Sequence, residues 1–189
     1  AQTIEFLRDV SQESGQSFSD LTGSFSKFAA SAVNAGVPLS TVQTVFANAA
    51  RAAGNLGLET EATGRILNAL GQIASKGTVQ MEELKGQLGE SLPGAMNLTA
   101  KALGLTTQEL TKLIESGGLL AEDALPAIGD AMLQLASKSG EVDGLTASWN
   151  RFTNVIKEAG TTVAEGAFGK AVGDILGGLV RWKFAWVAA

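Results

Sequence analysis

Carboxylates are the side chains of this sequence that could most readily do chemistry. The 189 residues include no Cys and no His, which removes disulfides, thiolate or imidazole metal sites, and Ser-His or Cys-His catalysis. Neighbouring residues on a helix point about 100° apart, so Glu82 and Glu83 make a poor acid-base pair. Glu122 and Asp123 suit the first turn of a helix, where the helix dipole stabilises negative charge. We therefore predict no catalytic residue, no metal or cofactor site and no enzymatic activity.

A helix-turn-helix is the sharpest alternative among binding motifs. Ala100, Gly104 and Leu110 have the spacing of a small residue, a turn glycine and an apolar anchor in that motif. Residues 59–145 carry a net charge of −6, however, and DNA affinity depends on Lys and Arg neutralising phosphates. DNA binding therefore stays the second interpretation, beside a plain helical hairpin. The side chains that would face the major groove are Thr107, Gln108, Glu109 and Lys112.

The elements that carry these residues are predicted to be helices throughout. Hydrophobic residues make up 45% of the chain and charged residues only 17%. Apolar residues recur at three- and four-residue steps, as in amphipathic helices, and no run alternates as a strand would. The predicted fold is all-α, a bundle or array of short and medium helices. Charge and composition divide it into an N-terminal helical region (1–58), a helical domain (59–145), and a C-terminal helix with a glycine-rich tail (146–189).

The first 35 residues contain a continuous apolar stripe. It predicts one long helix over residues 2–35, or a helical hairpin with a break at Ser14-Gly15. Self-association of this stripe as a coiled coil stays open beside an ordinary core-facing role. The stripe consists of Ile4, Leu7, Ser11, Ser14, Phe18, Leu21, Phe25, Phe28, Ala32 and Ala35.

Caps and glycines mark helix boundaries in the middle of the chain. A helix is predicted from about Glu59 to Lys76, ended by Gly77. Two capping boxes, in which a hydroxyl and a longer side chain bond each other's backbone N–H, are predicted. Their residues are Ser40 with Gln43, and Thr106 with Glu109.

Prolines and leucines complete the prediction for this region. Leu84 and Leu88 share a helical face, and Leu92 lies outside the helix because a proline follows it. Pro93 suits the first position of the next helix. Pro126 is predicted in the tolerant first turn of a later helix. The buried face of that helix is predicted to comprise Leu125, Ile128, Met132, Leu135 and Ala136.

Residues 146–189 combine a helical pattern with clustered glycines. An apolar stripe from Trp149 to Val163 predicts a helix, and the glycines from Gly160 onward predict poor order. The run from Arg181 to Trp186 mixes cationic and aromatic side chains, so weak contact with a membrane surface stays open beside a loose tail. No signal peptide or membrane-spanning helix is predicted.

Three short stretches in the middle of the chain form a recognisable set. They are EELKGQLGESLPGA at 82–95, GLTTQEL at 104–110 and GLLAEDALP at 118–126. In this order and spacing, within residues 66–136, they resemble the conserved block in the N-terminal domain of tape measure proteins of long-tailed bacteriophages and prophages. The residues of the motif are Glu82, Glu83, Leu84, Gly86, Gln87, Leu88, Leu92, Pro93, Gly94, Gly104, Leu110, Leu125 and Pro126.

The resemblance implies a structural protein of a phage, prophage or tailocin tail. Such a protein lies in the lumen of the virion tail, its length sets tail length, and it is expelled ahead of the genome. Assembly would occur in the host bacterial cytoplasm. The implied protein partners are the tail tube protein, tail tip or distal tail proteins, and tail assembly chaperones. Homo-oligomers and transient contact with the host membrane are also implied. Binding to a specific nucleic-acid sequence is not. Because family members are usually many hundreds of residues long, we expect this chain to be an amino-proximal domain or a fragment.

Overall fold

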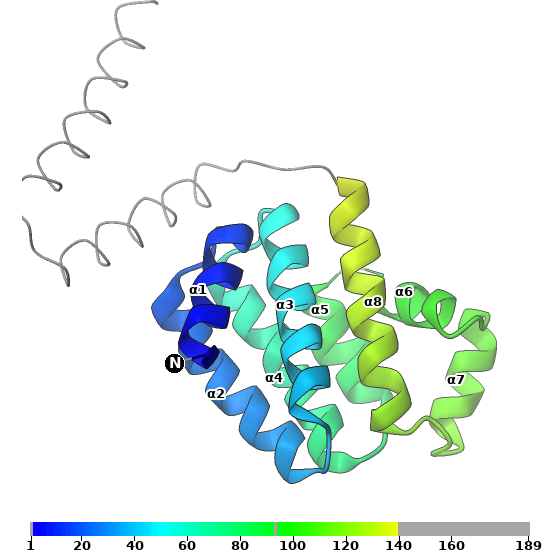
Figure 1. Cartoon of the computed structure of the whole chain (residues 1–189). Coiled ribbons are helices and arrows are strands. Elements are labelled where there is room, and N and C mark those ends of the chain that lie inside the picture. The colour runs from blue at the N-terminus through cyan, green and yellow to red at the C-terminus, as the bar shows by residue number, and fades with distance from the viewer. Residues whose placement is uncertain (1, 93, 140–189) are drawn as a thin grey trace, which may run out of the picture. The chain divides into compact units, whose positions relative to one another are not determined.

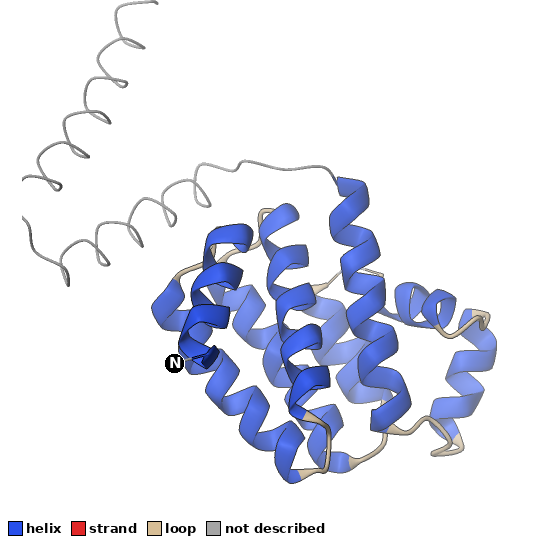
Figure 2. Cartoon of the chain, viewed as in Figure 1, coloured by secondary structure: helices blue, strands red, loops and turns tan. Residues whose placement is uncertain are grey.

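Helices joined by short turns make up the part of the chain that the structure describes (Figure 2). This computed structural model describes residues 2–92 and 94–139, which lie in the first of two compact units, 1–151 and 152–189. The all-α prediction is confirmed. The elements in chain order (Figure 1) are α1 (Gln2–Ser14), α2 (Phe18–Asn34), α3 (Leu39–Asn55), α4 (Thr60–Lys76), the π-helix η1 (Glu82–Leu88), α5 (Gly89–Ser91), α6 (Ala95–Ala102), α7 (Thr107–Glu115) and α8 (Ala121–Ser139).

The apolar stripe of the first 35 residues folds as two helices. Because α1 ends at Ser14 and α2 begins at Phe18, the hairpin alternative is confirmed and the single long helix is wrong. The chain turns at Gly15, whose φ of 65° is costly for a residue with a side chain. Two serines at the end of α1 support the turn: Ser14 Oγ accepts from the Gln16 N–H at 3.3 Å, and Ser11 Oγ donates to the carbonyl oxygen of Gln16 at 2.9 Å. Most of the stripe is buried, but Ile4 in the first turn is 54% exposed.

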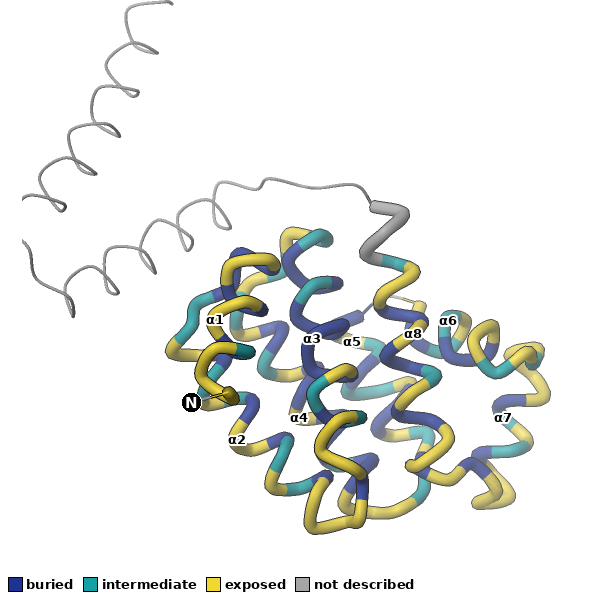
Figure 3. The backbone as a smooth tube through the Cα atoms, in the orientation of Figure 1, coloured by how far each residue is buried: buried dark blue, intermediate teal, exposed yellow. Residues whose placement is uncertain are grey.

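α3 is the central helix of the described bundle and packs against α1, α2, α4 and α8. Its buried residues extend round most of the helix rather than along a single face (Figure 3). Small residues such as Ala49 and Ala53 are fully buried and allow the neighbouring helices to come close. The closest approach is at Gly54, where a Cβ atom would lie 2.0 Å from the carbonyl oxygen of Ser14 at the end of α1.

The helix start predicted at Ser40 is wrong. α3 begins at Leu39 with Pro38 as its N-cap, and no side chain caps it. Ser40 therefore lies within the first turn, where its carbonyl oxygen accepts a hydrogen bond from Thr44 Oγ1 at 3.0 Å. Proline explains the earlier start, because its ring fixes φ near the helical value and its missing N–H is not needed there.

One hydrophobic core joins helices from before and after residue 58. Phe6, Phe25 and Phe46 bring α1, α2 and α3 together, with ring centroids 5.0 to 6.1 Å apart. α8 closes on α3 where a Cβ on Gly129 would lie 3.2 Å from Val45 Cγ2. The predicted division of the chain at residues 58 and 145 rests on charge and composition and stays a prediction.

α4 has the predicted bounds, and Gly77 follows it with a φ of 72°. α6 instead begins at Ala95, behind Gly94, two residues later than predicted. Pro93 itself lies outside the described residues. The apolar residues that α4 buries in the core include Ala62, Ile66, Ala69, Leu70 and Ile73.

The turn after α4 is fixed to the turn before α8. Thr78 and Leu120 form an isolated antiparallel bridge. The Val79 N–H donates to the carbonyl oxygen of Leu119 at 2.9 Å, which completes the connection. α6 packs on α8, and α7 packs on α6 beyond it (Figure 1). The predicted helix over 149–163, the glycine-rich tail and the run 181–186 lie outside the described residues.

Candidate functional site

The first motif stretch, residues 82–95, supplies η1 and α5 on one side of α4. Its leucines face inward: Leu84 and Leu88 are fully buried, and Leu92 is buried just after the helix, at a φ of −128°. η1 is π-helical over its whole length. π-Helices, with bonds from i to i+5, are rare and recur at functional sites.

Glu83 is a charged side chain in the interior of this stretch. Its carboxylate is fully buried, and Oε1 accepts a hydrogen bond from Nζ of Lys76, the last residue of α4. This hydrogen bond is the main cause that raises the pKa of Lys76 above its ordinary value. Oε2 of Glu83 has no hydrogen-bond partner among the described residues. The adjacent Glu82 is exposed, so the two carboxylates occupy different environments.

Polar side chains continue this contact along α4. Gln87 Nε2 donates to Gln72 Oε1 at 3.1 Å, and Arg65 Nε donates to Ser91 Oγ at 3.2 Å. The family resemblance includes Glu83 and Gln87 among its motif residues but not their partners Lys76 and Gln72. Residue spacing does not reveal these partners either, because contacts between two helices leave no period in either one. We call this set the α4–η1 seam, formed by Arg65, Gln72 and Lys76 on α4 and by Glu83, Gln87 and Ser91 opposite.

The second motif stretch begins α7 with the predicted capping box. Thr106 Oγ1 accepts from the Glu109 N–H at 3.2 Å, and Glu109 Oε2 accepts from the Thr106 N–H at 2.8 Å. The backbone hydrogen bond, and then the hydroxyl of Thr106, hold the pKa of Glu109 below its ordinary value. Gly104 precedes the cap with a φ of 69°, and Leu110 is fully buried.

The third motif stretch begins α8, with Glu122 and Asp123 in its first turn as predicted. Leu125 is buried. Pro126 lies inside the helix rather than in its first turn, because α8 already begins at Ala121. Without an N–H, Pro126 cannot donate to the carbonyl of Glu122 one turn earlier.

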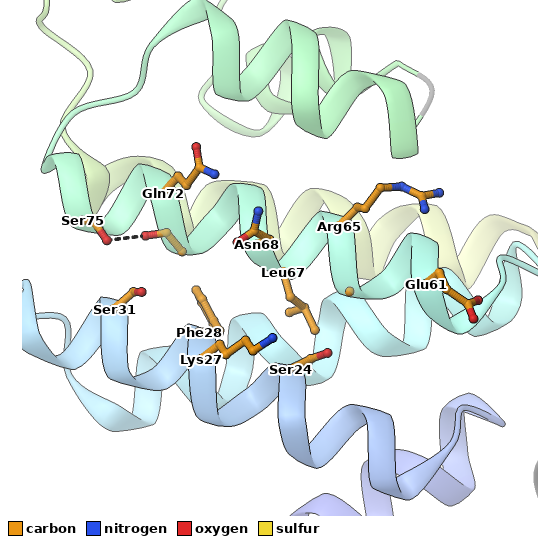
Figure 4. Close-up of a pocket in the computed structure, with 12 residues that line it drawn as sticks. Ser24, Lys27, Phe28, Ser31, Glu61, Arg65, Leu67, Asn68, Gln72 and Ser75 are labelled. Carbon is orange, nitrogen blue, oxygen red and sulfur yellow. Dashed lines mark hydrogen bonds between the residues drawn. The ribbon is translucent and has the colours of Figure 1, made fainter.

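A groove of about 450 Å³ lies between α2 and α4, apart from the motif stretches (Figure 4). Phe28 and Leu67 contribute apolar surface to it, and Lys27, Glu61 and Arg65 contribute both signs of charge. The hydrogen bonds of the described residues include no nucleophile held by a base in this groove, the arrangement that nucleophilic catalysis needs. Its remaining residues are Ser24, Ser31, Gly64, Asn68, Gly71, Gln72 and Ser75.

Metal-ligand clusters and membrane-spanning helices are both missing from the described residues. Within residues 2–92 and 94–139, no three His, Cys, Asp or Glu side chains are grouped so that they could hold a metal ion. In the same part of the chain, no helix combines the length and apolar character needed to cross a bilayer.

The helix pair of the DNA-binding alternative is present as α6 and α7. Ala100 and Leu110 are buried between them and their neighbours, and Thr107, Gln108 and Lys112 are exposed on α7. Glu109, on the same exposed surface, would repel phosphates. The arrangement of α6 and α7 is thus that of a helical hairpin, and it does not favour DNA binding over a purely structural role.

Comparison with known proteins identifies the family of this chain. The tape measure protein family matches residues 1–170. The chain belongs to this family. The match extends to residue 1, well beyond the block over 66–136 that carries the resemblance in sequence. The tape measure family is structural rather than catalytic.

A relative of this tape measure chain is known from Salmonella phage Felix O1. Its probable tape measure protein is 38% identical over 141 residues, which cover 75% of this chain. The same region covers 19% of the relative, so the chain spans about a fifth of the length of the protein it matches. No solved structure matches the chain significantly.

Proposed function

We propose that this chain acts within a tape measure protein that sets the length of a phage, prophage or tailocin tail and is released during genome ejection. The observation that carries the proposal is the tape measure family match over residues 1–170. Its 38% identity to the probable tape measure protein of phage Felix O1 supports the same assignment.

Within that role, the described bundle serves as a folded body rather than as the measuring length. α8, with 19 residues, is about 28 Å long at 1.5 Å per residue. As a single straight helix, the described residues would reach about 200 Å. The folded bundle is therefore much shorter than a single helix of the same residues. In this proposal, tail length is set by extended helix outside residues 2–139.

The bundle contributes by contact with other tail components. We propose that its partners are the tail tube protein, tail tip or distal tail proteins and tail assembly chaperones, with further copies of the same chain. These contacts form during assembly in the host bacterial cytoplasm and place the protein in the lumen of the virion tail. Transient contact with the host membrane is proposed for residues 181–186, which lie outside the described part.

A conditional null mutation in a phage that encodes this chain tests the proposal. An amber codon at Gln43, early in α3, should give filled heads and no normal tails on a non-suppressing host, as seen by electron microscopy. Normal tails should return on a suppressor strain that inserts Gln. Tails of ordinary length and number on the non-suppressing host would contradict a tape measure role.

A further inference from the structure

The segment formed by η1 and α5, residues 82–91, is attached to the bundle through a limited set of neighbours. Its principal contacts with other described helices are with α4 and α6. The contacts that assemble the rest of the core, α1 with α3, α2 with α4 and α3 with α8, do not involve it. The segment could therefore separate from the bundle without dismantling those interfaces.

The face that this segment turns to α4 is polar as well as apolar. Leu84 and Leu88 supply buried apolar surface. Beside them runs the α4–η1 seam, with the Gln72–Gln87 contact at 3.1 Å and the Arg65–Ser91 contact at 3.2 Å. The Gln72–Gln87 hydrogen bond is neutral and exchanges readily with water, and the Arg65–Ser91 hydrogen bond has one charged partner, the Arg65 guanidinium. The Lys76–Glu83 pair is the contact of the seam in which both partners are ionisable and opposite in charge.

Glu83 makes the closed arrangement depend on Lys76. A buried carboxylate is strongly disfavoured unless it is paired and its oxygens are hydrogen-bonded. Lys76 satisfies one oxygen of Glu83, and the second has no partner among the described residues. Without the Lys76 ammonium, neither oxygen of the Glu83 carboxylate would have a partner. Opening of residues 82–91 would return the carboxylate to water.

The π-helical conformation of η1 also suggests that residues 82–91 depend on their contact with α4. A run of seven π-helical residues is unusual, since π-helices occur mostly as single turns within α-helices. In this fold the run is held between α4 and α6. Lys76 is suited to do so, because it is the last residue of α4 before Gly77 and its side chain is 46% exposed, within reach of both solvent and Glu83.

We propose that the Lys76–Glu83 pair is a latch that holds residues 82–91 in their π-helical conformation against α4. When the latch is broken, this segment opens as a unit while α1 to α4 and α8 stay folded. Opening uncovers Leu84, Leu88 and the seam residues of α4, a surface hidden in the closed bundle. The inference does not depend on the tape measure function.

Hydrogen exchange of the full chain, followed by mass spectrometry, tests the latch. Lys76→Met keeps the aliphatic stem and removes the ammonium. We expect exchange in peptides covering residues 82–91 to rise at least about tenfold, because the buried Glu83 carboxylate loses its ionic partner, with little change in α3 and α8. Lys76→Arg should retain most of the protection. The matched control is Arg51→Met, which breaks the exposed Arg51–Glu13 pair and should leave residues 82–91 unchanged.

Two results would overturn the latch. One is an equal rise in exchange across all helices of Lys76→Met, since the pair would then support the whole fold. The other is unchanged exchange over residues 82–91. If Lys76→Met does not fold, hydrogen exchange of the wild-type chain is measured at increasing urea concentrations instead. The free energy of opening for amides of residues 82–91 must then depend less steeply on urea than that for amides of α3. The same urea dependence for both sets of amides would contradict the proposal.

Discussion

Buried polar side chains fix the turns of this bundle at the scale of single residues. Gln16 is almost fully buried. Its Nε2 donates to the carbonyl oxygen of Leu58 at 3.1 Å, and its Oε1 accepts from Thr63 Oγ1 at 3.2 Å. The turn between α1 and α2 is thereby tied to the turn between α3 and α4. Glu83 is also a buried polar side chain, but it lies within η1, and its Oε2 has no hydrogen-bond partner among the described residues.

The capping box of α7 gives the first prediction at this scale. Thr106→Ala removes the hydroxyl that accepts from the Glu109 N–H, and should lower the free energy of unfolding by about 1 kcal/mol. Thr111→Ala is the matched control, because its hydroxyl bonds within the helix to the carbonyl oxygen of Thr107 and alanine favours helix. Urea denaturation measures both. Equal losses for the two variants would show that the cap has no special role.

The charge on Glu109 predicts a pH dependence. Because the folded state lowers the pKa of Glu109 below its ordinary value of 4.5, the folded chain binds fewer protons there than the unfolded chain. This stabilisation is present above pH 4.5 and is lost as the pH falls through the lowered pKa. Glu109→Gln should therefore reduce the urea midpoint at pH 7 and make less difference at pH 3.

Glu115→Gln is the control for this titration. It removes an exposed carboxylate from the opposite end of α7, where negative charge opposes the helix dipole. It should not reduce the urea midpoint at pH 7. A stability difference for Glu109→Gln that is the same at both pH values would contradict the capping account.

At the scale of elements, close helix packing depends on particular glycines. A Cβ on Gly54 would lie 2.0 Å from the backbone oxygen of Ser14, whereas a Cβ on Gly64 would meet only Ser24 Oγ at 3.7 Å. Gly54→Ala should therefore force α1 from α3 and cost about 3 kcal/mol. Gly64→Ala should be neutral or stabilise the chain by up to about 1 kcal/mol. Thermal unfolding of both variants checks the contrast, and similar shifts in Tm would contradict the packing described.

The elements also show what sequence can and cannot predict here. Glycines at helix ends and the Thr106–Glu109 cap are local signals, and they place α4 and α7 well. The start of α3 was mispredicted because a proline can replace the expected Ser40 cap. The π-helical form of η1 and the seam partner Lys76 depend on contacts with distant residues. No spacing within residues 82–91 reveals them, since Leu84 and Leu88 would share a face in an α-helix as well.

At the scale of the whole molecule, the motif positions mostly build and hold the fold. Leu84, Leu88 and Leu110 are fully buried, and the third motif stretch begins the helix that closes on α3. The motif positions could be chosen from the sequence by resemblance, and their functional role stays a prediction. The α2–α4 groove could not be predicted, because its lining residues come from two helices that meet only in the fold.

The length of the tail is the property that tests the tape measure assignment most directly. In a phage that encodes this chain, in-frame deletions should be made within extended helical sequence of its tape measure gene, outside residues 2–139. Electron microscopy of purified virions then gives the tail length for each deletion. The account predicts shortening by about 1.5 Å for each residue removed, in proportion across a series. Tails of unchanged length throughout that series would contradict it.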